Sequence, residues 1–236
     1  MLAIDFNKVF KNYRQQSVLK QITFQIEVGE FFGLVGVNGV GKTTLLKSTL
    51  DFCDINQGSI HILGVTHTLP QARQQIAFLP EQFTPPHYMT GEHFLLYMAK
   101  LYDHAYDESK VHHIFKILDI QIEALKQSVS NYSKGMAQKL GLAACFLSNK
   151  QILILDEPMT GLDPKVRAYL KQYLLGLKKQ GVTLFFSTHL LADVEILCDR
   201  MAILHEGSVR FVGTPADCCT QFMASTLEDA YLRCVG

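Results

Sequence analysis

The chain has 236 residues, 48% hydrophobic and 19% charged, with 22 basic and 22 acidic side chains that cancel to a formal net charge of zero. This length fits one large domain, or a core with a small subdomain. The neutral balance and the lack of a basic run argue against non-specific nucleic-acid binding, because such binding depends on cations that neutralise phosphates.

Signals for membrane insertion and secretion are missing from the sequence. No apolar run approaches the ~18 residues of a membrane-spanning helix, and the first ten residues, MLAIDFNKVF, do not place a basic leader before an apolar core. We therefore expect a cytoplasmic protein whose link to a membrane comes through a partner. The six cysteines form no CxxC pair, so we expect free thiols rather than disulfides.

The N-terminal part of the chain predicts strands and one helix. Residues 2–6, 22–28 and 58–63 alternate between apolar and polar side chains, which is the pattern of half-buried strands in an antiparallel sheet. The run FFGLV at 31–35 is apolar throughout, as expected for a strand buried on both faces. A helical pattern over residues 42–50 follows this run.

The middle of the chain reads as helices only. From about residue 85 to residue 148, helices are expected at 91–102, 107–118 and 136–148. We interpret 85–148 as a helical subdomain inserted into a core formed by residues 1–84 and 149–236, which makes the whole chain, 1–236, a single domain.

After the helical stretch, buried strands and helices alternate. Helices are expected at 164–180 and 190–198, and the tail carries Ser225-x-x-Glu228, the pattern of a capping box. Strand–helix alternation predicts an α/β fold with a parallel sheet, joined to an N-terminal antiparallel β subdomain. The continuous apolar runs of this part are ILIL (152–155), TLFFS (183–187) and MAIL (201–204).

Residues 36–43, GVNGVGKT, match the phosphate-binding pattern G-x-x-x-x-G-K-[ST] at every fixed position. Glycines let successive backbone N–H groups converge on phosphate oxygens, and the following helix adds its N-terminal N–H groups. Lys42 would place a positive charge on the β- and γ-phosphates, and Thr43 would offer its hydroxyl to Mg²⁺. The sequence therefore predicts a P-loop NTPase core that binds ATP with Mg²⁺. The expected contacts are Gly36, Val37, Asn38, Gly39, Val40, Gly41, Lys42, Thr43 and Thr44.

Two carboxylates follow the predicted strand ILIL. Asp156 and Glu157 then lie at the carboxyl edge of the sheet, where α/β folds bind their ligands. Asp156 is suited to hold Mg²⁺, directly or through water. Glu157 is the next residue, so it points differently and is suited to orient or deprotonate a water molecule.

The order of these motifs resembles the ATP-binding subunit of an ABC transporter, and the resemblance covers nearly the whole chain. In that family a signature motif, ideally LSGGQ, closes on the γ-phosphate held by the partner subunit. YSKGM stands here at 132–136, as in the exporter-like group, and Ser133 and Gly135 match. The resemblance also assigns Asp163 to the loop that crosses the dimer interface, and His189, in Ser187-Thr188-His189, to the switch histidine at the γ-phosphate. It makes Lys42, Glu157 and His189 the catalytic residues.

Two further positions follow from the resemblance. An aromatic residue upstream of the phosphate loop stacks on adenine in the family; Tyr13 is the best match, with Val18 nearby and Phe10 as a competitor. The family's glutamine follows a strand ending in Leu-Pro or Val-Pro. Strict alignment places Glu81 there, and a shift of one residue places Gln82. Both are oxygen ligands that can reach Mg²⁺ or the attacking water.

The resemblance implies an ATPase that powers transport. The ATPase would act as a dimer, and we expect a homodimer. It would drive a separate transmembrane permease at the cytoplasmic face of the cell membrane. No nucleic-acid partner is expected. The alternative is a non-transport ABC ATPase that acts on nucleic acid or ribosomes. The long coiled coils, zinc motifs and tandem cassettes of such relatives are missing from this sequence. The transported substrate is not readable from the sequence, because the permease would select it.

Overall fold

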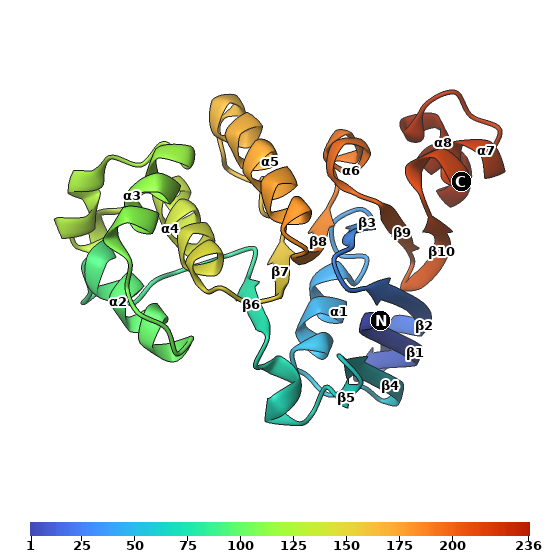
Figure 1. The fold of residues 1–236 in the computed structure, drawn as a ribbon. Coiled ribbons are helices and arrows are strands. Elements are labelled where there is room, and N and C mark those ends of the chain that lie inside the picture. The colour runs from blue at the N-terminus through green and yellow to red at the C-terminus, as the bar shows by residue number, and fades with distance from the viewer.

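The computed structural model describes all 236 residues. Two β-sheets lie beside each other, helices cover them, and a group of helices stands to one side of both sheets (Figure 1). The α/β fold with a parallel sheet and an antiparallel β part, predicted from the sequence, is confirmed.

The larger sheet has six strands in the order β10-β9-β3-β8-β7-β6, and all but the edge strand β10 run parallel. Every residue of β3, β7 and β8 is buried, as the continuous apolar runs predict. The strands are β3 (Phe31–Val35), β6 (Ile76–Leu79), β7 (Ile152–Asp156), β8 (Thr183–Thr188), β9 (Arg200–His205) and β10 (Ser208–Gly213).

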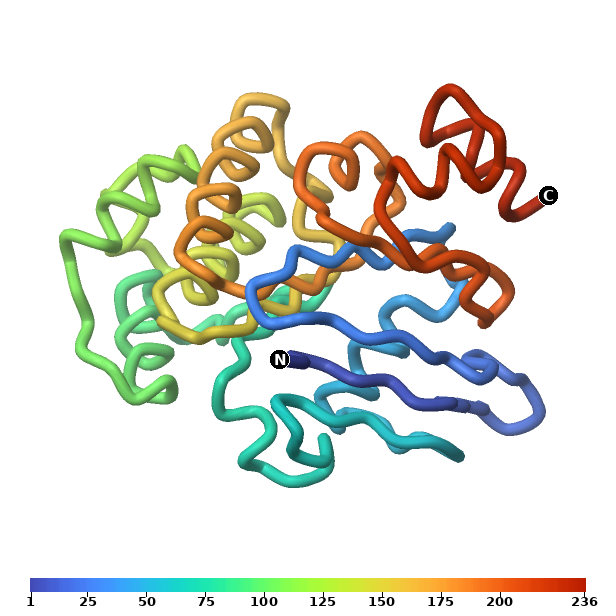
Figure 2. Tube along the Cα trace, turned by 45° about the vertical axis from the view of Figure 1, so that its right-hand side comes forward, coloured from blue at the N-terminus to red at the C-terminus, as the bar shows by residue number.

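The smaller sheet is antiparallel, in the order β2-β1-β4-β5. Its strands β1 (Leu2–Tyr13) and β2 (Gln16–Glu27) form a long hairpin, visible as the paired blue segments of Figure 2. Both strands extend beyond the predicted alternating stretches. Their outer ends are mostly exposed, so backbone hydrogen bonds between the strands, rather than a buried face, hold them together. The other strands are β4 (Gln57–Ile62) and β5 (Val65–Thr66).

Helices cover both faces of the larger sheet. Phe185 belongs to the hydrophobic core shared with α1 (Lys42–Thr49) and the antiparallel sheet, whereas its neighbour Phe186 belongs to the core shared with α4 (Lys134–Leu147) and α5 (Pro164–Lys179). Successive residues of a strand point to opposite faces, so one apolar run serves both cores. The helix α5 (Pro164–Lys179) begins at residue 164, as predicted, with Asp163 as its cap, and α6 (Leu191–Leu197) follows β8.

Three α-helices lie between β6 and β7 in the chain and form the group at the left of Figure 1. Their first turns are capped by side-chain oxygens of Thr90, Asp107 and Ser133. Because Ser133 is the cap, the third helix begins two residues earlier than its apolar pattern suggests. The helices are α2 (Gly91–Leu101), α3 (Glu108–Ile117) and α4 (Lys134–Leu147), with 3-10 turns η2 (Ile122–Lys126) and η3 (Val129–Asn131) before α4 and η1 (Pro70–Arg73) before β6.

The C-terminal end corrects one detail of the sequence analysis. The last helix, α8 (Leu227–Val235), is capped by Thr226, which accepts from the Asp229 N–H, and not by Ser225 with Glu228. The capping box lies instead at α7 (Pro215–Gln221), where Thr214 and Asp217 bond reciprocally. Both candidate caps of α8 have the right residue type, so only the observed helix boundary separates them. No helix in the molecule has the length and apolarity needed to cross a membrane.

Four phenylalanines join the two sheets. Phe185 of the parallel sheet is fully buried, and its ring centre lies 6.0 Å from that of Phe6 and 6.3 Å from that of Phe24, both in the antiparallel sheet. Phe24 also stacks on Phe32 of β3, with ring centres 5.1 Å apart. Such aromatic contacts add to the burial of apolar area, so this cluster fixes the antiparallel sheet against the core.

We predict that Phe185→Ala lowers the free energy of unfolding by about 3–5 kcal/mol, because it leaves a cavity among three buried rings. Urea denaturation followed by circular dichroism measures the change. Phe52→Ala is the control, since that side chain is 65% exposed, and a loss of less than about 1 kcal/mol is expected for it. Equal losses in the two variants would contradict the role of the cluster.

Candidate functional site

The predicted phosphate-binding loop connects β3 to α1, and two of its glycines, Gly36 and Gly41, stand where a side chain would be crowded. A Cβ on Gly36 would lie 2.5 Å from the carbonyl oxygen of Leu204. Gly41 has φ +114°, in the left-handed region, and caps the start of α1. The backbone of Val18 approaches Gly41 closely, so Val18 lies against the loop.

Lys42 is the first residue of α1, and its side chain is buried within the loop itself. Its ammonium group donates to the carbonyl oxygens of Gly36 at 2.7 Å and Val37 at 3.3 Å. It also lies 3.1 Å from Glu157 Oε1, an ion pair without hydrogen-bond geometry. A buried cation requires such partners. These contacts therefore hold the ammonium group of Lys42 within the loop that is predicted to bind phosphate.

The two carboxylates end β7, next to the end of β8. Asp156 Oδ1 accepts from the Ser187 hydroxyl, and Asp156 Oδ2 is buried without a hydrogen-bond partner. Glu157 Oε2 accepts from His189 Nδ1 at 2.9 Å. Glu157 therefore lies between the imidazole of His189 on one side and the ammonium of Lys42 on the other.

A hollow at the loop is lined by eight residues, none of them hydrophobic. Of the two candidates for the family's glutamine, Glu81 lines this hollow and Gln82 does not. The other lining residues all belong to the predicted set, namely Asn38, Gly39, Gly41, Lys42, Thr43, Thr44 and Glu157. Val40 is buried beneath the loop in the hydrophobic core.

Tyr13 lies at the end of β1, beside the start of α1, and its side chain is 46% exposed. The pKa of Tyr13 is raised, chiefly by the neighbouring thiol of Cys53 and next by burial, while the nearby Thr44 side chain opposes the rise. The ammonium of Lys11 lies 4.9 Å from the centre of the Tyr13 ring. The ring is thus exposed beside Thr44, one of the residues lining the hollow.

Ser133, Gly135 and Asp163 do not line the hollow. They lie together elsewhere, because a Cβ on Gly135 would come within 3.4 Å of the carbonyl oxygen of Gly161, just before Asp163. Asp163 Oδ1 accepts from the Val166 N–H at 3.0 Å; this bond, with Lys139 nearby, lowers the pKa of Asp163. The structure therefore forms two groups of predicted residues, one at the loop and one at the start of α4.

Sequence reasoning gave no role to Ser187, although it stands two residues before His189. Its fully buried hydroxyl contacts both Asp156 and Glu157. The run TLFFS marks Ser187 as a polar residue ending a buried strand. That signal does not indicate which strand lies beside it, so its partners were not predictable.

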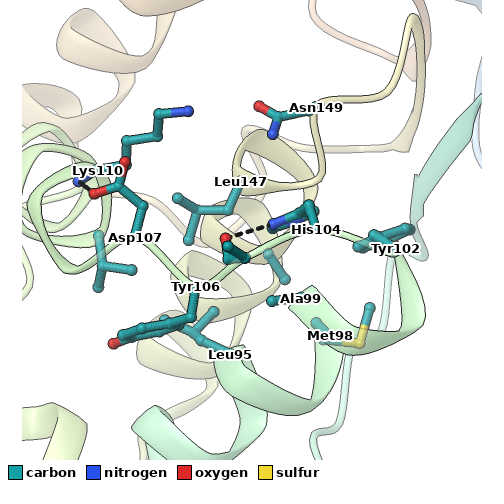
Figure 3. A pocket seen from close by; sticks show the side chains of 13 residues that line it. Leu95, Met98, Ala99, Tyr102, His104, Tyr106, Asp107, Lys110, Leu147 and Asn149 are labelled. Carbon is teal, nitrogen blue, oxygen red and sulfur yellow. Dashed lines mark hydrogen bonds between the residues drawn. The ribbon is translucent and has the colours of Figure 1, made fainter.

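A second pocket lies in the helical group, between α2, α3 and α4 (Figure 3). It is lined mainly by apolar side chains such as Leu95, Met98 and Leu147, and His104 Nδ1 donates to the neighbouring carbonyl of Ala105 at 2.9 Å. It shares no residue with the hollow at the phosphate loop. We therefore assign the candidate site to the loop, where the charged groups converge.

Comparison with known proteins gives matches to one protein family. The family model described as "ABC transporter" matches residues 19–160. An uncharacterized ABC transporter ATP-binding protein of Synechocystis sp. is 38% identical over 203 residues, which cover 84% of this chain and 57% of that protein. The ABC-type transporter ATP-binding protein EcsA of Bacillus subtilis is 34% identical, over 94% of this chain and 92% of EcsA. The chain spans only 57–64% of the length of two of the curated relatives it matches.

Solved structures agree with this family. An ATP-binding subunit of an ABC transporter superposes with a TM-score of 0.89 at 30% identity, covering 98% of this chain and 99% of that one. A dimeric ATP-binding cassette with bound ADP and phosphate has a TM-score of 0.80 at 22% identity, over 89% of this chain and 98% of that one, which shows a shared fold. The resemblance inferred from the sequence motifs is confirmed, and the chain belongs to the ABC transporter family.

Proposed function

We propose that this chain binds MgATP at the phosphate loop, hydrolyses it and so powers a separate transmembrane permease. The main support for the proposal is that Lys42, Glu157 and His189 come from three different elements and meet at one place. Glu157 lies 3.1 Å from Lys42 Nζ through Oε1 and 2.9 Å from His189 Nδ1 through Oε2. We further propose that residues 1–236 form one ATPase domain, with about 85–148 as its helical subdomain.

ATP binding would exchange the partners of Lys42. Its ammonium now faces two loop carbonyls and the Glu157 carboxylate. The β- and γ-phosphates carry more negative charge than these partners, and a helix N-terminus such as the start of α1 favours an anion. We infer that Lys42 moves to the phosphates and releases Glu157 Oε1 for the attacking water. Tyr13, exposed beside Thr44, is the proposed platform for adenine, with Val18 next to the loop.

The oxygen atoms of the site fit Mg²⁺. Asp156 Oδ2 is buried without a partner at the end of β7, and Thr43, at the start of α1, lines the hollow together with Glu157, the neighbour of Asp156 in the chain. A hard divalent cation prefers such oxygen ligands. Bound there, it would neutralise charge on the β- and γ-phosphates. Thr43 and Asp156 are therefore the proposed metal ligands, directly or through water.

Glu157 is the proposed base for hydrolysis. It accepts a hydrogen bond from His189, so its carboxylate is oriented before ATP arrives. A carboxylate placed in this way can take a proton from water as the water attacks the γ-phosphate. His189 is 43% exposed on its side chain, which leaves it accessible to a phosphate from outside the loop.

The separation of Ser133, Gly135 and Asp163 from the hollow supports a second copy of the chain as partner. Ser133 and Gly135 stand at the start of α4 and Asp163 at the start of α5, and none of them lines the hollow of its own chain. In a head-to-tail homodimer they would reach the ATP held by the partner, so that each site uses both chains.

The permease is proposed on the printed names of the relatives, such as the Nod factor export ATP-binding protein I of Rhizobium etli. Binding to this permease would place the chain at the cytoplasmic face of the membrane.

Glu81 is the proposed occupant of the family's glutamine position, because it lines the hollow whereas Gln82 does not. A carboxylate at this position differs from the amide in that it can only accept hydrogen bonds when ionised. It would therefore interact with the metal or the attacking water as an acceptor alone.

Lys42→Ala should weaken ATP binding about 10–100-fold, because a charge-assisted interaction with phosphate is worth about 1.5–3 kcal/mol. Equilibrium binding of labelled ATP measures the effect. Lys47→Ala is the matched control, since Lys47 is exposed in the last turn of the same helix. Wild-type affinity in Lys42→Ala would contradict the assignment of the loop.

Glu157→Gln should lower turnover about 10²–10⁴-fold while ATP stays bound, because the amide keeps the shape but accepts no proton. The variant should then elute as a dimer from gel filtration in MgATP. Glu195→Gln, an exposed carboxylate of α6, serves as control. Near-wild-type hydrolysis by Glu157→Gln would exclude Glu157 as the base.

Glu81→Ala should reduce the hydrolysis rate about tenfold more than Gln82→Ala does, because only Glu81 faces the hollow. Steady-state release of phosphate at saturating ATP compares the two variants. The opposite ranking would place Gln82, not Glu81, in the glutamine position.

A further inference from the structure

One buried hydroxyl connects the two acidic residues at the end of β7. Asp156 and Ser187 are direct partners in the parallel pairing of β7 with β8. The Ser187 hydroxyl donates to Asp156 Oδ1 and accepts from the Glu157 N–H at 2.9 Å. Ser187 is fully buried, so no water replaces either bond.

The bond to Asp156 decides which carboxylate oxygen is free. A serine hydroxyl has one hydrogen to donate, and here it goes to Oδ1. Oδ2 is left buried and without a partner. The Ser187 hydroxyl therefore holds the carboxylate in one orientation, with a single oxygen available for a cation.

The bond from Glu157 holds the backbone at an unfavourable conformation. Glu157 has φ +48°, in the left-handed region that side-chain-bearing residues seldom adopt. The Glu157 N–H points to Ser187 instead of continuing the strand ladder. With the backbone in this turn, the Glu157 carboxylate reaches both His189 Nδ1 and Lys42 Nζ. Such strain persists only where the surrounding structure enforces it.

We propose that Ser187 is a positioning residue for ATP hydrolysis: it orients the Asp156 carboxylate toward the metal and fixes the turn that directs Glu157 toward the attacking water. The inference rests on the function proposed above. Ser187 itself contacts neither substrate nor metal, and it acts through the two acids.

The test compares Ser187→Ala, which removes the hydroxyl, with Ser187→Thr, which keeps it on a residue that suits a strand. Thr183→Val is the matched control. Thr183 begins the same strand, is buried, and accepts from the Gly29 N–H at 2.8 Å, far from the acids. It therefore reports the cost of losing a buried hydroxyl from β8. If Ser187→Ala does not fold, Ser187→Cys takes its place, because a thiol has a similar shape and is a weak donor.

Two binding measurements do not depend on turnover. Electron paramagnetic resonance of free Mn²⁺ gives the affinity for Mn²⁺ in the presence of ADP, and ADP binding in EDTA gives the affinity of the loop alone. Ser187→Ala should weaken Mn²⁺ binding about tenfold and lower kcat about 10–100-fold, as for partners that orient metal ligands. ADP binding in EDTA should stay within about threefold in every variant, because the loop is unchanged. Ser187→Thr should restore both metal affinity and kcat.

The proposal is overturned if Ser187→Ala, or Ser187→Cys in its place, binds Mn²⁺ as the wild type does. It is also overturned if a folded Ser187→Thr is as defective as Ser187→Ala, or if Thr183→Val shows the same losses. Should the wild-type chain bind Mn²⁺ and ADP without hydrolysing ATP, the proposed hydrolysis fails, and the Mn²⁺ comparison still decides the role of Ser187.

Discussion

The parallel pairing of β7, β8 and β3 is the constraint on which the site depends. Parallel strands end at the same edge of a sheet, so the residues that follow them become neighbours. The phosphate loop follows β3, Asp156 and Glu157 stand at the end of β7, and His189 follows β8. The register sets the finer geometry, because it pairs Asp156 with Ser187. A different strand order would separate these groups by at least one strand spacing, about 4.8 Å.

Charge balance is maintained within this edge of the sheet. Lys42 and Glu157 are both about 5% exposed, and a buried charge is tolerated only when it is paired or hydrogen-bonded. The two side chains form an ion pair with each other. Lys42 also donates to a loop carbonyl, and Glu157 also accepts from His189. Removal of one member would leave the other buried without its counter-charge. In the proposed function, a bound phosphate would take the place of the Glu157 carboxylate as the counter-charge of Lys42.

The group formed by α2, α3 and α4 carries residues that are proposed to contact the ATP of a second copy. Its third helix starts at Ser133, whose hydroxyl caps the Met136 N–H, and it packs with the loop that carries Gly161 and Asp163. None of these residues lines the hollow of its own chain. If these residues complete the site of a second copy, as proposed, hydrolysis would depend on the association of two chains. Such dependence would couple chemistry to movement of the subunits, which is what a permease would use.

Local sequence predicted the buried strands and the phosphate loop of this protein. The buried strands follow from apolar runs such as FFGLV and ILIL, and the loop at 36–43 follows from the spacing of its glycines around Lys42. These features depend on neighbours in the chain. Tertiary structure alone decided that Glu81 and not Gln82 lines the hollow, and that Ser187 joins Asp156 to Glu157. Those contacts join residues about thirty or more positions apart. They depend on strand order and register, which the continuous apolar runs of β7 and β8 do not fix, because these runs have no polar face. The sequence by itself determined the elements and their chemistry, and the packing of the sheet determined which groups meet.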